Sequence, residues 1–154
     1  MNRLLEESIR NADGRYLSDR ELSPLEHYAH SYHNRLNTYT LLHQNADQLV
    51  TRSLQQMGVS DPYVTQHKTT CFRDMSYVVR MVAIALLRDD EDGFKQEFVL
   101  WMQNILAALH KDAQSAKAYR ILQITIANEL PSDNAKLVNH YLSEFIAALS
   151  TNRP

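Results

Sequence analysis

Thr69–Leu87, with the sequence TTCFRDMSYVVRMVAIALL, is the stretch that decides the fold, and it holds the only cysteine of the chain. Thr69 and Thr70 are candidate N-cap residues, which places Cys71 in the first turn of a helix. At about 100° per residue, one face of that helix carries Cys71, Asp74, Met75, Val78, Val82, Ala85 and Leu86. The opposite face carries Arg73, Tyr77, Arg80 and Ile84. Both faces are largely apolar, so we expect a helix that is buried on two sides.

Asp74 is the charged residue of the first face, one turn after the thiol. An unpaired buried carboxylate costs several kcal/mol, so a cation or a set of N–H donors should meet it. Arg73 is its neighbour in sequence but points about 100° away, which favours a different anion as the partner of Arg73.

Composition limits the class of protein. A chain of 154 residues suits one domain with a core, and three glycines and four prolines indicate an all-α fold. A formal net charge of −2 argues against a nucleic-acid partner. We expect no signal peptide and no membrane-spanning segment, because no basic start precedes an apolar core and no apolar run approaches about 18 residues. A lone cysteine cannot form an internal disulfide, which favours the cytoplasm.

The rest of the chain also reads as helices. A short helix over residues 2–12 should end at Asp13-Gly14, and Ser18 with Glu21 predicts a capping box for the next one. Residues 19–57 form either two helices or one long bent helix. Further helices are expected over 94–110 and 115–130, and the last helix should be capped by Ser132 or Asp133. The side chains expected to point inward from the last three helices are Phe98, Trp101, Ile105, Ala108, Leu109, Tyr119, Leu122, Ile126, Leu130, Leu137, Tyr141, Phe145 and Leu149.

Two features invite other interpretations. His27, His30 and His33 follow a spacing of three, which turns the last side chain about 120° from the first, so we interpret them as exposed residues rather than metal ligands. Trp101 could contact a bound ligand or fill the core, and the core is the expectation.

Four segments in order resemble one family. Cys71–Arg80, CFRDMSYVVR, resembles the chromophore-helix motif C-x-R-D-x-x-Y-x-x-R of the phycobiliproteins. Asn11–Ser18 resembles the N-terminal segment of that family, Asn45–Val50 its next helix and Tyr141–Ser150 its closing helix. The resemblance implies an all-α, globin-like fold, with an N-terminal helical hairpin over residues 1–32 and a bilin-binding core over 33–154.

The resemblance also implies a function that is not enzymatic. An open-chain, phycocyanobilin-like tetrapyrrole, a bilin, would be attached through a thioether to Cys71 for light harvesting and energy transfer. Asp74 would accept hydrogen bonds from the central pyrrole N–H groups, Arg73 would bind a propionate, and Tyr77 would complete the site. The first helical turn should favour the thiolate of Cys71, and the sulfur and the acid should share one wall of an apolar cavity.

A partner is implied as well. In phycobiliproteins the hairpin joins two chains, so Asp13 should pair with an arginine of the partner at the position of Arg80. The partner is either a second copy or a different phycobiliprotein-like subunit. In the alternative, the hairpin folds back on its own core.

Departures from the family pattern keep other readings open. The connection over residues 58–68 looks shortened, Tyr63–Thr70 holds no asparagine, Thr70 stands where a lysine is frequent, and Val78 replaces a tyrosine. A divergent relative associated with bilin biosynthesis could bind, sense or carry a tetrapyrrole without a covalent bond. A haem globin would need an axial histidine, for which His110 is the candidate. The plainest alternative is that Cys71 is a small buried hydrophobe and Asp74 pairs with an arginine.

Overall fold

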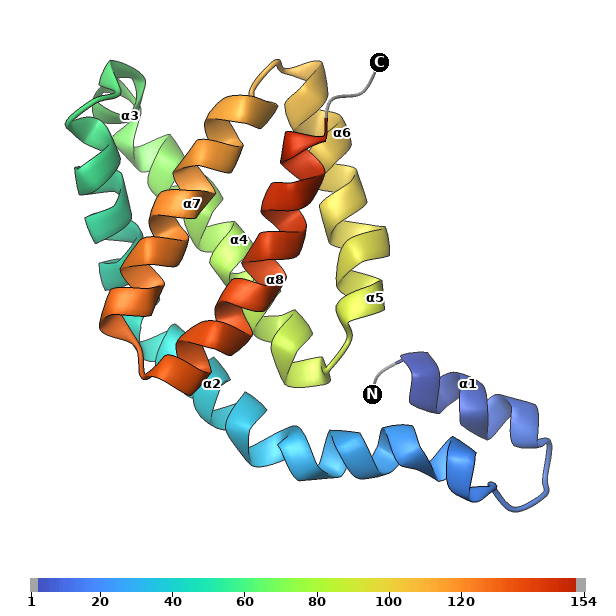
Figure 1. Cartoon of the computed structure of the whole chain (residues 1–154). Coiled ribbons are helices and arrows are strands. Elements are labelled where there is room, and N and C mark those ends of the chain that lie inside the picture. The colour runs from blue at the N-terminus through green and yellow to red at the C-terminus, as the bar shows by residue number, and fades with distance from the viewer. Residues whose placement is uncertain (1–2, 152–154) are drawn as a thin grey trace.

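The computed structural model describes residues 3–151, and these contain helices but no strand. In chain order the elements are α1 (Arg3–Ala12), α2 (Asp19–Gly58), α3 (Pro62–Gln66), α4 (Lys68–Arg88), α5 (Glu91–Gly93), the π-helix η1 (Phe94–Val99), α6 (Leu100–Ala108), α7 (Asp112–Glu129) and α8 (Ser132–Ser150). The predicted all-α, globin-like fold with an N-terminal hairpin is confirmed. Figure 1 shows the hairpin of α1 and the start of α2 standing out from a body formed by the other helices.

Local signals set the hairpin turn as predicted. Asp13 and Gly14 both adopt positive φ, 45° and 82°, so the chain reverses directly after α1. The Ser18 side chain accepts from the Glu21 backbone N–H, while the Glu21 carboxylate accepts from the Ser18 backbone N–H, which completes the capping box. Arg15 adds an ion pair to Glu21 at 2.7 Å, and these contacts lower the pKa of Glu21 to about 2.

The segment left open as one helix or two is a single helix, α2. Figure 1 shows it turning from the hairpin into the body. Its buried side chains lie between Arg35 and Met57, so its first part is the more exposed one. The predicted boundary between the hairpin and the core, at residues 32 and 33, therefore lies inside the continuous helix α2.

Arg35 fastens α2 to the end of α4. Its side chain is 2% exposed, and its guanidinium donates to the backbone carbonyls of Leu87 and Tyr28 and to the Ser31 hydroxyl. The guanidinium also lies 4.2 Å from the centre of the Tyr28 ring, a cation–π contact. The carbonyl of Leu87 lies at the C-terminal end of α4, where the helix dipole favours a cation, so this contact fixes the direction in which α2 leaves the body.

α4 crosses the body and supplies much of the core. The apolar part of its predicted face is buried: Met75, Val78, Val82, Ala85 and Leu86. The prediction that the helix is buried on two sides is wrong, because Arg73 and Arg80 are exposed, Tyr77 is 40% exposed and Ile84 is 44% exposed. The opposite face of α4 therefore meets solvent in the single chain.

An aromatic cluster joins η1 to α7 and α8. Phe145 of α8 is fully buried, and its ring centre lies 5.6 Å from that of Phe98 and 4.9 Å from that of Tyr119. The inward stripe of α7 is confirmed, with Tyr119, Leu122, Ile126 and the following Leu130 all buried. Tyr141, Phe145 and Leu149 of α8 are also buried.

Three expectations for the C-terminal half need correction. The predicted helix over 94–110 is instead the π-helix η1 followed by α6. The wider turn of η1 changes the register, so three side chains expected inside are exposed: Trp101 at 52%, Leu109 at 58% and Ala108. The N-cap of α8 is Pro131 and makes no side-chain cap bond, so the predicted roles of Ser132 and Asp133 are wrong. Within residues 3–151, every helix is too short or too polar to cross a membrane.

Candidate functional site

Cys71 lies in the first turn of α4, as predicted, but the start of the helix differs from the expectation. α4 begins at Lys68 after the N-cap His67, which makes no side-chain cap bond, so Thr69 and Thr70 are helical residues and not caps. The Cys71 backbone N–H donates to the His67 carbonyl at 3.0 Å. The thiol is half-buried, so it can react without unfolding of the helix.

The surroundings of Cys71 oppose its ionisation. Burial raises the pKa of the Cys71 thiol, and the carboxylates of Asp74 and Asp61 raise this pKa further. Lys111 acts in the opposite direction, and its ammonium is held by the Tyr63 hydroxyl at 2.9 Å. The expectation that the first helical turn favours the thiolate is wrong, because burial of the thiol and the two nearby carboxylates favour its protonated form.

Asp74 is exposed and paired. Its side chain is 60% exposed, and the Arg73 guanidinium, itself 72% exposed, contacts the carboxylate at 3.1 Å. The prediction of a buried carboxylate is therefore wrong, as is the expectation that Arg73 serves a different anion in the single chain. The long arginine side chain reaches its neighbour although the two Cα–Cβ directions diverge. In water this pair stabilises the fold by at most about 1 kcal/mol, so a ligand can replace either partner.

A groove begins one turn and a half beyond the thiol. It encloses about 190 Å³ between α4, η1 and α6 and is lined by Tyr77, Met81, Ile84, Ala85, Arg88, Asp90, Gly93, Phe94, Glu97, Phe98 and Trp101. Cys71 and Asp74 are not among these residues, so the prediction that they share one wall of an apolar cavity is wrong. Of the four predicted pigment-binding residues, Tyr77 alone lines the groove.

The groove has an aromatic side and a charged end. The Tyr77 ring lies 6.1 Å from that of Phe98, centre to centre, and the half-exposed indole of Trp101 also lines the groove. At the other end Arg88 contacts Asp90 at 3.6 Å. The aromatic faces suit a flat conjugated ligand, whereas the carboxylates of Asp90 and Glu97 beside Arg88 leave the charged end without an excess of positive charge.

Sequence reasoning missed most of this groove. Met81 and Ile84 lie on the face of α4 that was expected to be covered, and Trp101 was assigned to the core. The sequence did hold a signal for the groove: this face of α4 mixes apolar and charged residues, because Tyr77 and Ile84 alternate with two arginines. Such a face is apolar enough to bind a ligand or a partner and too polar for a core.

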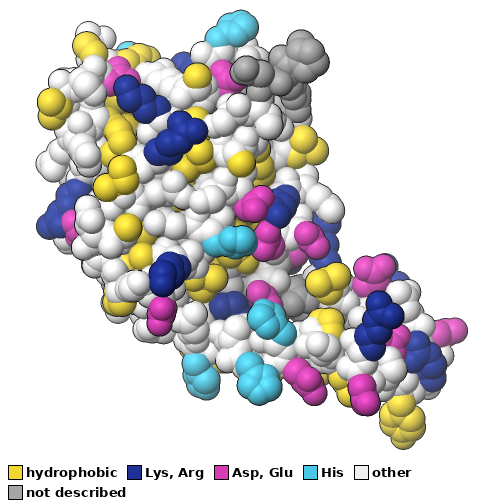
Figure 2. All heavy atoms as spheres, viewed as in Figure 1, with side chains coloured by type: hydrophobic (Ala, Val, Ile, Leu, Met, Phe, Trp, Pro, Cys, Tyr) yellow, Lys and Arg dark blue, Asp and Glu magenta, His cyan; other side chains and the backbone are white. Residues whose placement is uncertain are grey.

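The two predicted interface residues, Asp13 and Arg80, both have exposed side chains. Asp13 belongs to the hairpin turn, and Arg80 lies on the exposed face of α4. Exposed apolar side chains occur on the hairpin and the outer part of α2: Leu4, Ile9, Tyr16, Leu25, Tyr32 and Leu36. On the face in Figure 2, charges of both signs are interspersed with hydrophobic side chains, and histidines lie over the outer part of α2. His27, His30 and His33 are exposed, as predicted.

Known proteins resemble the chain over most of its length. The family model described as Phycobilisome protein matches residues 7–149. The allophycocyanin alpha chain of Galdieria sulphuraria is 30% identical over 158 residues, which cover 95% of this chain and 98% of the relative. The allophycocyanin alpha chain of Cyanophora paradoxa is 27% identical with the same coverage. The allophycocyanin subunit beta-18 of Aglaothamnion neglectum is 18% identical over 135 residues, which cover 81% of this chain and 79% of the relative. The chain therefore belongs to the phycobilisome protein family.

Proposed function

We propose that this protein binds a phycocyanobilin-like linear tetrapyrrole through a thioether at Cys71 and holds it for light harvesting, without enzymatic activity. The observation that supports this most directly is the reach from the thiol to the groove. Tyr77 follows Cys71 by six residues, which places it about 9 Å along the axis of α4 and about 120° around it. An extended ligand anchored at the sulfur would therefore pass over the Asp74 side of α4 to bring its far part into the groove. The pigment supplies the absorption of light and the transfer of excitation.

The size of the groove limits how the pigment is held. Its volume of about 190 Å³ is below the range of about 300–1,000 Å³ that encloses a drug-sized ligand. A tetrapyrrole therefore lies partly on the exposed face of α4 and is covered there by a partner. Met81, Phe98 and Trp101 form the apolar wall, and their packing keeps the ligand extended.

Arg73 and Asp74 separate when the pigment binds. Asp74 accepts the pyrrole N–H hydrogen bonds, and Arg73 turns to a propionate, which its planar guanidinium can bind with two parallel bonds. The exposure of both side chains makes this exchange inexpensive. Tyr77 contributes its ring to the near end of the groove.

Cys71 attaches the pigment by adding its S–H across a carbon–carbon double bond. The sulfur bonds to one carbon and the proton passes to the neighbouring carbon, so no oxidant or reductant is consumed. In the single chain, burial raises the pKa of the Cys71 thiol, and the carboxylates of Asp74 and Asp61 raise it further. Once Asp74 is engaged by N–H donors, its effect on the sulfur weakens and the thiolate becomes more accessible.

A second candidate has its own support. The raised pKa of Cys71 and the shallow groove favour a protein that binds, senses or carries a tetrapyrrole without a covalent bond. This fits the divergent relative of the family associated with bilin biosynthesis. The haem alternative has less support, because His110 is exposed in the turn that follows α6, and the lining of the groove, within the described residues, includes no histidine.

The proposal extends to assembly. The hairpin of residues 1–32 serves dimerisation, and residues 33–154 form the bilin-binding core; residues 1–2 and 152–154 of these ranges lie outside the described residues. Asp13 pairs with an arginine of a second copy or of a related subunit at the position of Arg80. The exposed apolar side chains of the hairpin support this. An opposing observation is that Arg3 donates to Gln96 at 2.8 Å and pairs with Glu97, which ties α1 back to its own η1. The compartment is the cytoplasm, as the single cysteine predicts.

Coexpression with bilin-synthesising enzymes tests the proposal. Denatured protein is separated on a gel and stained with zinc to reveal bilin fluorescence. A covalent bond predicts a fluorescent band that is lost in Cys71→Ala and kept in Thr70→Ala, the matched control on the same turn. A native colour that denaturation removes, in the wild type as well, favours the second candidate. An absence of bilin colour under native conditions contradicts both.

A further inference from the structure

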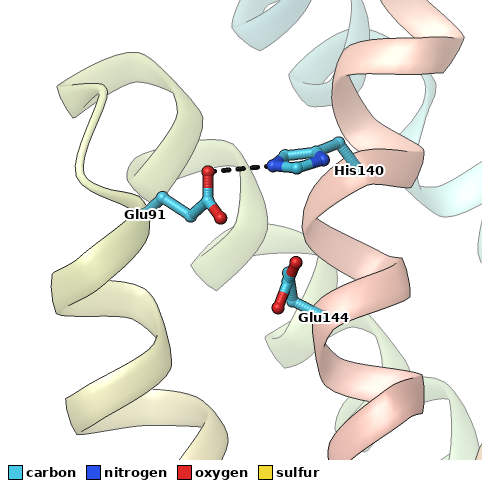
Figure 3. A group of neighbouring side chains, drawn as sticks. All are labelled: Glu91, His140 and Glu144. Carbon is cyan, nitrogen blue, oxygen red and sulfur yellow. Dashed lines mark hydrogen bonds and ion pairs between the residues drawn. The ribbon is translucent and has the colours of Figure 1, made fainter.

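Glu91, His140 and Glu144 form a cluster away from the thiol. Their ligand atoms all lie within 4.8 Å of one another. Glu91 is the first residue of α5, whereas His140 and Glu144 are four residues apart on α8 and so share one face of it. Figure 3 shows all three side chains pointing into the space between the two elements, with the Glu91 carboxylate facing the imidazole of His140.

The cluster already holds a cation that belongs to the chain. The Lys95 ammonium contacts Glu91 at 2.6 Å and Glu144 at 3.1 Å. The imidazole Nε2 of His140 lies 2.9 Å from the other oxygen of Glu91. The Lys95 side chain is 38% exposed and can swing into solvent.

We propose that Glu91, His140 and Glu144 bind a divalent transition-metal ion, of which Zn²⁺ is the type, and that the ion displaces the Lys95 ammonium. One imidazole nitrogen and two carboxylate oxygens are ligands that Zn²⁺ accepts, with water in the fourth position. Tetrahedral coordination with bonds of about 2.1 Å spaces ligand atoms by about 3.4 Å, so the widest pair of ligand atoms, at most 4.8 Å apart, must close by no more than about 1.4 Å. Rotation of the two glutamate side chains provides that movement.

The bound ion would link two elements of the fold, α5 and α8. α5 and α8 would be joined at the end of the groove, because Asp90 and Gly93 on either side of Glu91 line it. The Lys95 ammonium carries one positive charge, whereas the metal ion carries two. The ion therefore neutralises the two carboxylates of the cluster more fully than Lys95 does. This inference does not depend on the pigment or on Cys71.

Titration with zinc chloride tests the site, with calorimetry for affinity and thermal unfolding as a second readout. His140→Ala and Glu144→Gln should each weaken binding at least tenfold. Lys95→Met should tighten it severalfold, because the competing ammonium is gone while all three ligands remain. His30→Ala, which removes an exposed histidine of α2, should leave the affinity unchanged and is the matched control.

Two results would overturn the proposal. Equal binding by the wild type and His140→Ala would mean an adventitious ion only, held by other surface histidines. An absence of binding by both the wild type and Lys95→Met at millimolar zinc would mean that the cluster is solely an ion-pair network. Circular dichroism of each variant separates lost binding from lost folding.

Discussion

Phe145→Ala tests the aromatic cluster that supports the groove from behind. Phe145 is fully buried, and its ring packs on Phe98, which lines the groove, and on Tyr119 of α7. Truncation of a buried phenylalanine to alanine removes about 3–5 kcal/mol of unfolding free energy, because transfer and cavity costs add. For a chain of this size, each kcal/mol shifts the melting temperature by about 2–4 °C. The expected decrease is therefore about 6–20 °C.

The assay is urea and thermal unfolding followed by circular dichroism at 222 nm (the α-helical band). Phe145→Leu keeps most of the volume and should cost only about 1–2 kcal/mol, which gives a folded variant if the alanine variant fails. Ile124→Ala on α7, where the side chain is 53% exposed, should stay within about 0.5 kcal/mol of the wild type. A loss below about 1 kcal/mol for Phe145→Ala would refute the packing described here.

Three further predictions concern the thiol, the hairpin cap and assembly. Asp74→Asn removes a negative charge that raises the pKa of Cys71, so at pH 7.5 (below the ordinary thiol pKa of about 8.5) the thiol should react faster with a disulfide reagent such as DTNB; an unchanged rate would rule out that influence. Ser18→Ala removes the capping box and should destabilise the start of α2 by about 1 kcal/mol, visible as faster hydrogen exchange in the hairpin and not in α8. Asp13→Ala should weaken self-association or subunit pairing in sedimentation experiments, and an unchanged sedimentation coefficient with the partner present would argue against the hairpin interface.

The helices were predictable because their signals are local. Asp13-Gly14, the capping box at Ser18 and the apolar period of Met75, Val78 and Val82 each depend on neighbours within about two turns. These features fixed the ends of the hairpin and the inner face of α4 correctly. The π-helix was not predictable in this way, because an apolar period read at 3.6 residues per turn assumes an α-helix throughout, and Trp101 was misplaced as a result.

The candidate site was less predictable for a related reason. A helical projection tells which residues share a face of α4 but not where the covering elements stop. Asp74 does share a face of α4 with Val78, as the projection predicts. That part of α4 is not covered by another element, so the Asp74 carboxylate contacts solvent and Arg73. The pKa of Cys71 likewise depends in part on Asp61. Asp61 precedes α3, so a projection of α4 alone does not include it.

The central claim is that Cys71 is the point at which a bilin is bound covalently. Mass spectrometry of protein coexpressed with bilin-synthesising enzymes, denatured and digested with trypsin, measures this directly. The account predicts that the peptide containing Cys71 gains the mass of one intact tetrapyrrole, with no gain anywhere in the Cys71→Ala protein. Coloured protein whose Cys71 peptide carries no added mass would contradict it.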